Sequence, residues 1–306
     1  MKAITLERYG GPEDLRVSER PEPKVAPGEV LIRVRAAGVN PVDWKLAAGR
    51  LDAMMETRWP LIPGWDVAGV VEAVGLDVPE FSVGDEVMGY IRKDVVQLGA
   101  YAEYVAANVR LLARKPASMS WEEAAGLPLA GLTALQALDR VRVGEGDTVL
   151  VHAAAGGVGS LAVQIAVARG ARVIGTASER NHDFLRSLGA EPMAYGDGLA
   201  ERVRKAAPGG VDAVLDLVGG TADVSREAAS QVERIVSVVD REAPQWGGRY
   251  VWVRPDSAGL SGLADLVEAG RLTVPVEKVL PLEEAAEAWR LSQTGRTRGK
   301  IVLSVS

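Results

Sequence analysis

The sequence predicts an α/β protein with two domains, one rich in strands and one built on a doubly wound parallel sheet. The chain has 306 residues, which is long for one hydrophobic core and sufficient for two. Up to about residue 115 it is rich in valine, glycine and proline, and short apolar segments between glycine turns predict strands. After that point apolar strands and helices alternate, which is typical of a parallel sheet covered by helices on both faces.

The strand-rich part begins with a clear pattern, because Glu29 to Val39 alternates as a half-buried strand does. Further segments predict strands between glycine turns: 66–75, 84–90 and 100–108. Ser120 followed by Glu123 has the spacing of a capping box, which marks the start of a helical region over 118–138.

The second half predicts a repeated strand–helix pattern. Strands are expected at 148–152, 171–177, 210–220, 232–240 and 248–253. Helices are expected at 157–170 and 179–190, and each is closed by a glycine. The tail predicts a helix, a turn and a strand over 262–274, an amphipathic helix over 282–295 and a closing strand over 299–305.

Composition excludes several classes of function. The net charge of −6 argues against a protein that holds nucleic acid by neutralising phosphates. No apolar run reaches the ~20 residues that span a bilayer, and the first residues lack the apolar core of a signal peptide. We therefore expect a cytoplasmic protein without a membrane partner. Zero cysteines and two histidines, His152 and His182, leave no Cys/His zinc site, so no metal is expected.

The glycine cluster at 153–159 is the most informative motif. It aligns with the dinucleotide fingerprint G-x-G-x-x-G as Ala154, Gly156 and Gly159, between a strand and a helix. Gly156 would let the backbone approach a pyrophosphate, Gly159 would let the helix pack closely, and the helix N-terminus would supply N–H groups. The expected phosphate contacts are Ala155, Gly156, Gly157, Val158 and Gly159. A glycine-rich turn in an unrelated α/β protein is the alternative.

NADPH is the expected nucleotide. In NAD-binding versions an acidic residue about 20 positions further on binds the ribose 2′-hydroxyl, and here that position is Ala177. Ser178 and Arg180 follow, and a hydroxyl with a guanidinium suits a 2′-phosphate. Glu179 argues the other way, because it would repel a phosphate. The alternative is that Ser178 is only a helix N-cap and Arg180 only a solvated residue.

Five motifs together resemble the medium-chain dehydrogenase/reductase superfamily, in its zinc-free quinone oxidoreductase branch. They are AAGVNPVDWKLAAG (36–49), PGWDVAGVVEAVG (63–75), GLPLAGLTALQAL (126–138), AAAGGVG (153–159) and RGKIVL (298–303). The resemblance implies a GroES-like domain over 1–118 and 256–306, a Rossmann domain over 119–255 and an active site in the cleft between them. It also implies NADPH-dependent reduction of a quinone or an α,β-unsaturated carbonyl without zinc, and a homodimer formed through the edge of the Rossmann sheet.

The resemblance further implies individual site residues. In zinc-dependent relatives a ligand cysteine and a ligand histidine stand at the positions of Asn40 and Trp65. The implied cofactor contacts outside the glycine loop are Thr133, Asp216, Val218, Val251, Val253, Arg298 and Lys300. Each has a structural alternative, such as helix packing for Thr133, a strand-end cap for Asp216 and a surface charge for Lys300.

Hydride transfer to a carbonyl or quinone needs a donor for the developing oxyanion. Without zinc, Asn40 is the first candidate because its amide can donate. Asp43 would orient Asn40 or a ribose hydroxyl, and Lys45 would stabilise or protonate the anion. Trp65 and Tyr90 are expected to line the substrate pocket. The alternatives are a helix cap for Asp43 and a core position for Trp65.

Two other functions remain open at this point. One is an enoyl-thioester reductase of the same superfamily, and the other is a non-catalytic protein that binds NADPH as a sensor. The sequence also departs from the family pattern at 230–240, where SQVERIVSVVD lacks the usual glycine pair before the strand, and in the loop over 240–248.

Overall fold

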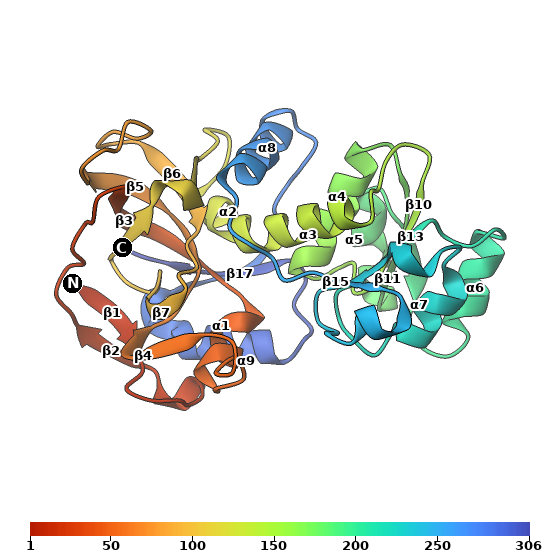
Figure 1. Ribbon diagram of the computed structural model, residues 1–306, viewed down its shortest axis with the longest axis horizontal. Coiled ribbons are helices and arrows are strands. Elements are labelled where there is room, and N and C mark those ends of the chain that lie inside the picture. The colour runs from red at the N-terminus through yellow and green to blue at the C-terminus, as the bar shows by residue number, and fades with distance from the viewer. The chain divides into compact units, whose positions relative to one another are not determined.

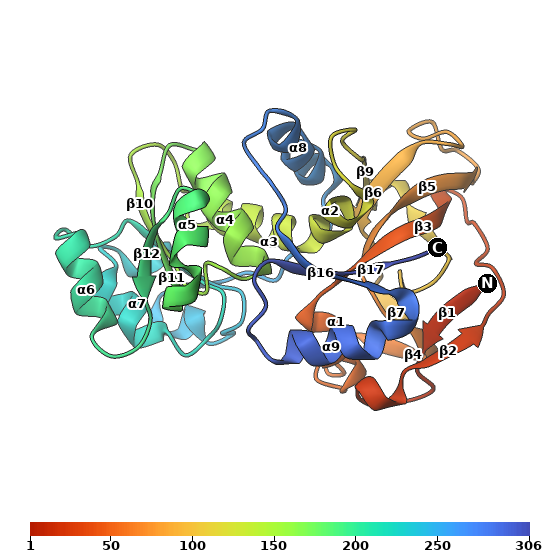
Figure 2. The ribbon, with the colours of Figure 1, turned by 180° about the vertical axis from the view of Figure 1, so that it is seen from behind.

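The computed structural model describes residues 1–306, and the chain forms two compact units. The first unit contains residues 1–129, 255–269 and 274–306, and the second contains 130–254 and 270–273. Figures 1 and 2 show the elements of each unit. The family resemblance implied a boundary at 118/119, eleven residues before this one, and the segment between the two boundaries contains α2 (Trp121–Gly126), which directly precedes α3 (Pro128–Arg140). In the structure α2 packs on the strands of the first unit.

A seven-stranded sheet forms the centre of the first unit. Its strand order is β16 (Val276–Pro281), β17 (Lys300–Ser304), β3 (Glu29–Val39), β5 (Asp66–Val74), β6 (Glu86–Tyr90) and β9 (Leu112–Arg114), with β8 (Tyr104–Asn108) also paired to β3. All pairs are antiparallel except β16 with β17. In β3, Ile32 and Val34 are buried whereas Arg33 and Arg35 are exposed, as the alternating sequence predicted.

Two small sheets and a few helices complete the first unit. The small sheets pair β1 (Lys2–Thr5) with β2 (Arg16–Glu19) and β4 (Glu56–Ile62) with β7 (Val95–Leu98). The helices are α1 (Pro41–Ala47), α2, α8 (Ser257–Glu268) and α9 (Ala285–Gln293), with 3-10 turns η1 (Pro12–Asp14), η2 (Val109–Leu111) and η6 (Leu282–Glu284). The strand expected within 262–274 is absent, and β16 follows it instead.

Side-chain caps fix where two of these helices begin. The predicted capping box of α2 is present, because Glu123 N donates to Ser120 Oγ (3.1 Å) and Ser120 N donates to Glu123 Oε2 (2.8 Å). Helix α1 begins directly after β3, with Asn40 as its N-cap and Pro41 as its first residue. The end of a buried strand therefore places Asn40 inside the unit.

The second unit is a six-stranded parallel sheet. Its order is β12 (Glu191–Ala194), β11 (Arg172–Ala177), β10 (Thr148–Val151), β13 (Ala213–Asp216), β14 (Ile235–Ser237) and β15 (Arg249–Tyr250). The chain runs outward from β10 in one direction and then in the other, so the sheet is doubly wound and its switch point is at β10. The helices are α3, α4 (Gly157–Ala168), α5 (His182–Ser187), α6 (Leu199–Ala206) and α7 (Ala222–Ala228), with 3-10 turns η3 (Glu179–Asn181), η4 (Val232–Arg234) and η5 (Ala243–Trp246).

Apolar residues of adjacent strands form the core of the second unit. Leu150, Ile174, Val214 and Ile235 come from four neighbouring strands and are fully buried, and Val203 of α6 covers them. Burying each such side chain stabilises the fold by roughly 1.5–3 kcal/mol. Both faces of this sheet are covered, so side chains on both sides of each strand are buried. For this reason the apolar runs in the sequence do not alternate with a period of two.

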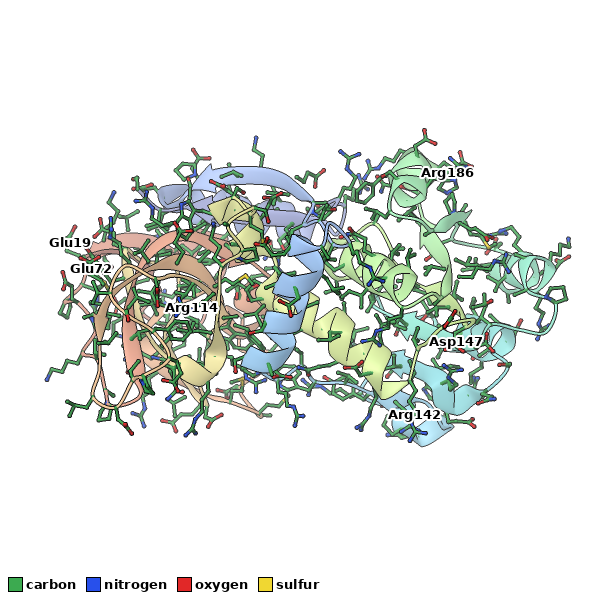
Figure 3. The ribbon with its side chains drawn as sticks, turned by 90° about the horizontal axis from the view of Figure 1, so that it is seen from above. Glu19, Glu72, Arg114, Arg142, Asp147 and Arg186 are labelled. Atoms are coloured by element: carbon green, nitrogen blue, oxygen red, sulfur yellow. The ribbon has the colours of Figure 1, made fainter.

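The unusual stretch before β14 contains an arginine clamp. Arg234 donates to both carboxylate oxygens of Asp147, at 3.1 and 2.7 Å, and to the carbonyls of Val141 and Arg142, at 3.0 and 3.1 Å. Figure 3 labels Asp147 and Arg142 on the connection that leads to β10. The clamp ties the start of β14 to that connection. The following loop forms η5, and Trp246 packs on the core.

Candidate functional site

The glycine cluster forms the turn between β10 and α4. Ala154 N donates to Thr176 O (2.9 Å) and Ala153 N donates to Thr176 Oγ1 (3.2 Å), so the turn is held against β11. Gly156 is the N-cap of α4, and no side chain caps the helix. The N–H groups of the first helical turn therefore have no partner within the helix or from a cap. The left-handed residue of the turn is Ala153, with φ of 53°.

The two glycines at the helix start have different steric surroundings. A Cβ at Gly159 would lie 2.3 Å from Ala153 O and 2.7 Å from Ala154 Cα, so only glycine allows the helix to pack this closely. A Cβ at Gly156 would meet only Ala153 O, at 3.4 Å, and would otherwise enter open space. That space lies beside the positive end of the helix dipole, and no acidic residue occupies the first turn. The loop therefore fits the pyrophosphate of a dinucleotide.

The residues expected to determine the specificity for NADPH over NADH follow β11. Ala177, the last residue of the strand, is buried and carries no acid. Ser178 is the N-cap of η3, and Glu179 and Arg180 are both exposed in this turn. An anionic and a cationic side chain thus lie at neighbouring positions of one turn, and the geometry accommodates either a 2′-phosphate or a 2′-hydroxyl.

Asp216, which the resemblance gave as a cofactor contact, has both carboxylate oxygens engaged inside the protein. Oδ1 accepts the N–H groups of Val218 (3.2 Å) and Gly219 (2.8 Å), and Oδ2 accepts the hydroxyl of Ser237 (2.7 Å). Ser237 Oγ in turn accepts the N–H group of Asp240 (2.8 Å). The carboxylate is therefore a strand-end cap that shapes two loops at the carboxyl edge of the sheet.

The other residues expected to contact the cofactor from the second unit vary in exposure. Val218 is 58% exposed, Val251 and Val253 are half-buried after β15, and Thr133 is buried in α3. His152, at the end of β10, is buried with Nε2 3.2 Å from Ser225 Oγ. Burial lowers the pKa of His152 to about 4, so the ring is neutral at pH 7 and packs as a core residue.

In the first unit, three polar side chains meet in a buried cluster of Asn40, Asp66 and Lys300. Lys300 Nζ donates to Asn40 Oδ1 (2.6 Å) and to Val39 O (3.2 Å), and Asn40 Nδ2 donates to Asp66 Oδ2 (2.9 Å). The ammonium also lies 3.9 Å from Asp66 Oδ2. The second carboxylate oxygen, Oδ1, accepts the N–H group of Leu129 (2.8 Å).

Sheet register explains why these three residues meet. Asp66 begins β5 opposite Gly38, and Ile301 of β17 lies opposite Val39, so the relevant ends of β17, β3 and β5 are adjacent. All three side chains are buried. Burial raises the pKa of Asp66 to about 6, opposed by Lys300, and burial lowers the pKa of Lys300, opposed by Asp66. Lys300 is thus a buried residue and not a surface residue.

A second carboxylate, Asp43, lies beside this cluster. Its Oδ2 accepts the backbone N–H group of Asn40 (2.9 Å) and the hydroxyl of Tyr101 (2.9 Å), and Trp289 Nε1 donates to Tyr101 Oη at 3.4 Å. Asp43 Oδ1 is buried without a hydrogen-bond partner. Burial raises the pKa of Asp43 to about 7. Asp43 therefore caps α1, and Tyr101 and Trp289 fix the capping carboxylate.

The remaining expected site residues of the first unit lie outside the cluster. Lys45 is half-buried, with Nζ 5.5 Å from the centroid of the Trp44 ring, and burial lowers its pKa, as does Arg50 to a smaller extent. Arg298 is exposed, and its backbone N–H group donates to Glu277 Oε2 (2.7 Å).

Trp65 and Tyr90 are both buried and pack against each other, with ring centroids 6.1 Å apart. Tyr90 Oη makes no hydrogen bond, and burial raises the pKa of this phenol. Sequence reasoning missed Asp66 and Trp289 as members of the buried network. The signal for Asp66 was its position in the PGWD motif, directly after Trp65, at the start of a strand that is otherwise apolar.

The residues at the positions of the zinc ligands do not fit a zinc ion. Asn40 and Trp65, at the positions where the resemblance implies a thiolate and an imidazole ligand, offer neither group, and Lys300 Nζ lies 2.6 Å from Asn40 Oδ1. No group of three or more His, Cys, Asp or Glu residues is arranged to hold a metal ion. We predict that metal analysis of the active protein will find no bound zinc.

Comparison with known proteins agrees with this geometry. Residues 26–117 match the alcohol dehydrogenase GroES-like domain, and residues 188–303 match a zinc-binding dehydrogenase domain. The chain is 31% identical to a chloroplast envelope quinone oxidoreductase homolog of Arabidopsis thaliana, over 99% of this chain and 98% of the relative. It is 35% identical to the chloroplastic NADPH-dependent alkenal/one oxidoreductase of the same plant, over 99% and 79%.

Among solved structures, the quinone oxidoreductase from Coxiella burnetii superposes with a TM-score of 0.88 at 37% identity, over 100% of this chain and 99% of the other. The chain belongs to the medium-chain dehydrogenase/reductase superfamily, in its quinone oxidoreductase-like branch. It is an oxidoreductase of the NAD(P)-binding kind. None of its helices has the length and apolar character needed to cross a membrane.

Proposed function

We propose that the protein uses NADPH to reduce a quinone or an α,β-unsaturated carbonyl compound. The observation that carries the proposal is the open cradle at the N-terminus of α4, where a Cβ at Gly156 would enter space that the protein leaves free. The acceptor class is supported by the two plant relatives, one described as a quinone oxidoreductase homolog and the other as an alkenal/one oxidoreductase.

The second unit holds the cofactor in this proposal. The first-turn N–H groups of Gly157, Val158 and Gly159 bind the pyrophosphate. Ser178 and Arg180 bind the 2′-phosphate, and Arg180 outweighs the repulsion from Glu179 because a guanidinium can form two charge-assisted hydrogen bonds with a phosphate. Bound NADPH supplies a hydride.

The first unit supplies the hydrogen-bond donor and the proton donor for the reduced acceptor. Asn40 Nδ2 uses one hydrogen in its bond to Asp66 and has a second for an oxygen that gains negative charge. The Lys300 ammonium on Asn40 Oδ1 polarises the amide and makes Nδ2 a stronger donor. Lys45, whose pKa is lowered by burial, is the proposed source of the proton that completes the reduction.

The test is a panel of acceptors with purified protein, with NADPH consumption followed by absorbance. We expect turnover with naphthoquinones or alkenals and no loss of activity after treatment with a chelator. Faster turnover with enoyl thioesters would favour the second candidate, a thioester reductase. Binding of NADPH without oxidation by any acceptor would identify a non-catalytic protein and refute the proposal.

We also propose that the protein is a homodimer, on the basis of its family and of the edge position of β15 in the sheet of the second unit, and that it is cytoplasmic, on the basis of its composition. Sedimentation of the purified protein tests the dimer, and fractionation of cells that express it tests the compartment. A monomer at micromolar concentration would contradict the first statement.

A further inference from the structure

We infer that Asp66 and Lys300 are positioning residues, which hold the Asn40 carboxamide in one orientation and leave one of its Nδ2 hydrogens for the acceptor oxygen. The inference rests on the proposed function, because it assigns a task to Asn40 in the reduction. It goes beyond that proposal by naming two residues that act through Asn40 without touching the acceptor.

Charge determines the orientation of the amide. A primary carboxamide has an acceptor end and a donor end, which exchange places when the group turns by half a rotation. In the structure the acceptor Oδ1 faces the Lys300 ammonium at 2.6 Å and the donor Nδ2 faces Asp66 Oδ2 at 2.9 Å. The turned amide would place N–H groups against the ammonium and an oxygen against the carboxylate. Both contacts would then be repulsive, so the two ions select the same orientation.

The two ions are themselves fixed by their surroundings. Asp66 Oδ1 accepts the N–H group of Leu129, and Lys300 Nζ donates to the carbonyl of Val39. Asp66 is fully buried and Lys300 is 4% exposed, so bulk water does not compete for these hydrogen bonds. In this low-dielectric environment each charge acts strongly on the amide. Asn40 Nδ2 donates one hydrogen to Asp66, and its second hydrogen is not used in that bond.

Removal of Lys300 should reverse the amide. Lys300 is the only cation that opposes the raised pKa of Asp66, so Lys300→Met should leave the carboxyl protonated near neutral pH. A protonated Asp66 donates a hydrogen bond, and Asn40 must then turn its oxygen toward it. The Nδ2 hydrogens would rotate toward the carbonyl of Val39 and away from the position in which they serve the acceptor.

Kinetics provide the first test. For Lys300→Met and Asp66→Asn we expect kcat to fall roughly 10²-fold, the usual effect of losing one oxyanion donor, with the Kd for NADPH unchanged. Activity of Lys300→Met should recover as pH rises and Asp66 ionises. The matched control is Lys278→Met on the neighbouring strand β16, whose exposed side chain should be dispensable. Wild-type kcat in either cluster variant, or a loss that does not change with pH in Lys300→Met, would overturn the inference.

A second test observes the amide directly and needs neither cofactor nor acceptor. The chain has three asparagines, Asn40, Asn108 and Asn181, so selective ¹⁵N labelling gives few side-chain signals, and Asn40→Asp identifies the Asn40 signal by its loss. We expect one Nδ2 proton to be shifted downfield and protected from exchange in the wild type, and to lose both properties in the variants. An unchanged signal would refute the positioning role.

The wild type alone suffices if the variants do not fold. Asp43, which accepts the Asn40 backbone N–H group, has a pKa of about 7, so the titration step near pH 6 is the one that reports Asp66. The Asn40 side-chain signal should move in this lower step, and a signal that does not move there would contradict the inference. The proposed function and the positioning role can be refuted separately. A wild type that oxidises no NADPH removes the proposed function, whereas an active wild type whose cluster variants are equally active removes only the positioning role.

Discussion

Alanine at Gly159 should destabilise the second unit, whereas alanine at Gly156 should leave the fold intact and weaken NADPH binding. The two positions are three residues apart at the start of one helix. They differ in what a methyl group would meet, which is protein backbone at Gly159 and open space at Gly156. The pair therefore separates the packing role of the glycine motif from its binding role.

The size of each effect follows from the distances. A Cβ at Gly159 would lie 2.3 Å from Ala153 O and 2.9 Å from Ala154 C, and these backbone atoms cannot move aside as a flexible side chain could. Such overpacking costs about 1–3 kcal/mol, which corresponds to a fall in Tm of about 2–12 °C for a unit of this size. At Gly156 the backbone has φ of −77° and ψ of 178°, which alanine adopts readily. The Tm should therefore change by no more than about 2 °C.

Thermal unfolding followed by circular dichroism measures the first effect, and titration with NADPH followed by fluorescence measures the second. For Gly156→Ala we expect at least a tenfold increase in the Kd for NADPH, or about 1.4 kcal/mol, because the methyl group would occupy space needed by the pyrophosphate. Wild-type affinity in Gly156→Ala would refute the placement of the pyrophosphate at this helix. An unchanged Tm in Gly159→Ala would refute the steric argument.

Three further predictions concern other parts of the molecule. Arg180→Ala should raise the Kd for NADPH at least tenfold and leave the Kd for NADH unchanged, whereas Arg186→Ala, on exposed α5 (Figure 3), should change neither. Burial raises the pKa of Asp43 to about 7 and of Asp66 to about 6, from 3.8, so between pH 4 and 7 the folded state holds protons that the unfolded chain has released. Burial lowers the pKa of His152 to about 4, so this ring opposes the effect below pH 6.5, and the contribution of Asp43 is measured as the difference between the wild type and Asp43→Asn. Relative to the variant, the free energy of unfolding of the wild type, from urea titrations, should fall as pH rises through this window, by about 1.4 kcal/mol per pH unit; parallel curves would contradict the raised pKa of Asp43. Finally, Arg234→Ala should lower the Tm by several degrees without changing the Kd for NADPH, and an unchanged Tm would show that the clamp is dispensable.

The parts of the fold that sequence predicted well are those in which local pattern and tertiary environment agree. The strand predicted over Glu29 to Val39 matches the observed one residue for residue, although its burial alternates only over residues 32–35 and both faces are buried over 36–39. The capping box at Ser120 and the glycine turn into α4 are local structures, so sequence identifies them directly. Strand β4 was missed because its residues, ETRWPLI, have no alternation and contain a proline.

The buried cluster was harder to predict, because its members are far apart in the chain. A lysine in RGKIVL is expected at the surface, since an isolated charge is seldom buried. Only the pairing of β17 with β3, and of β3 with β5, shows that Lys300, Asn40 and Asp66 meet. Periodicity identifies the strands but gives no information on which strand ends become neighbours, so the role of Asp66 could not be found from its own segment.

The separation of Lys300 from Asn40 by 260 residues has a consequence for the order in which the protein is made. The second unit lies almost entirely between them, as the contiguous segment 130–254, and leaves the ribosome before β17 is synthesised. During that time the N-terminal strands carry Asn40 and Asp66 without the cation that balances them. The nascent first unit therefore holds an incomplete sheet and an uncompensated acid, and we expect it to complete its fold only after its neighbour in the sequence has emerged.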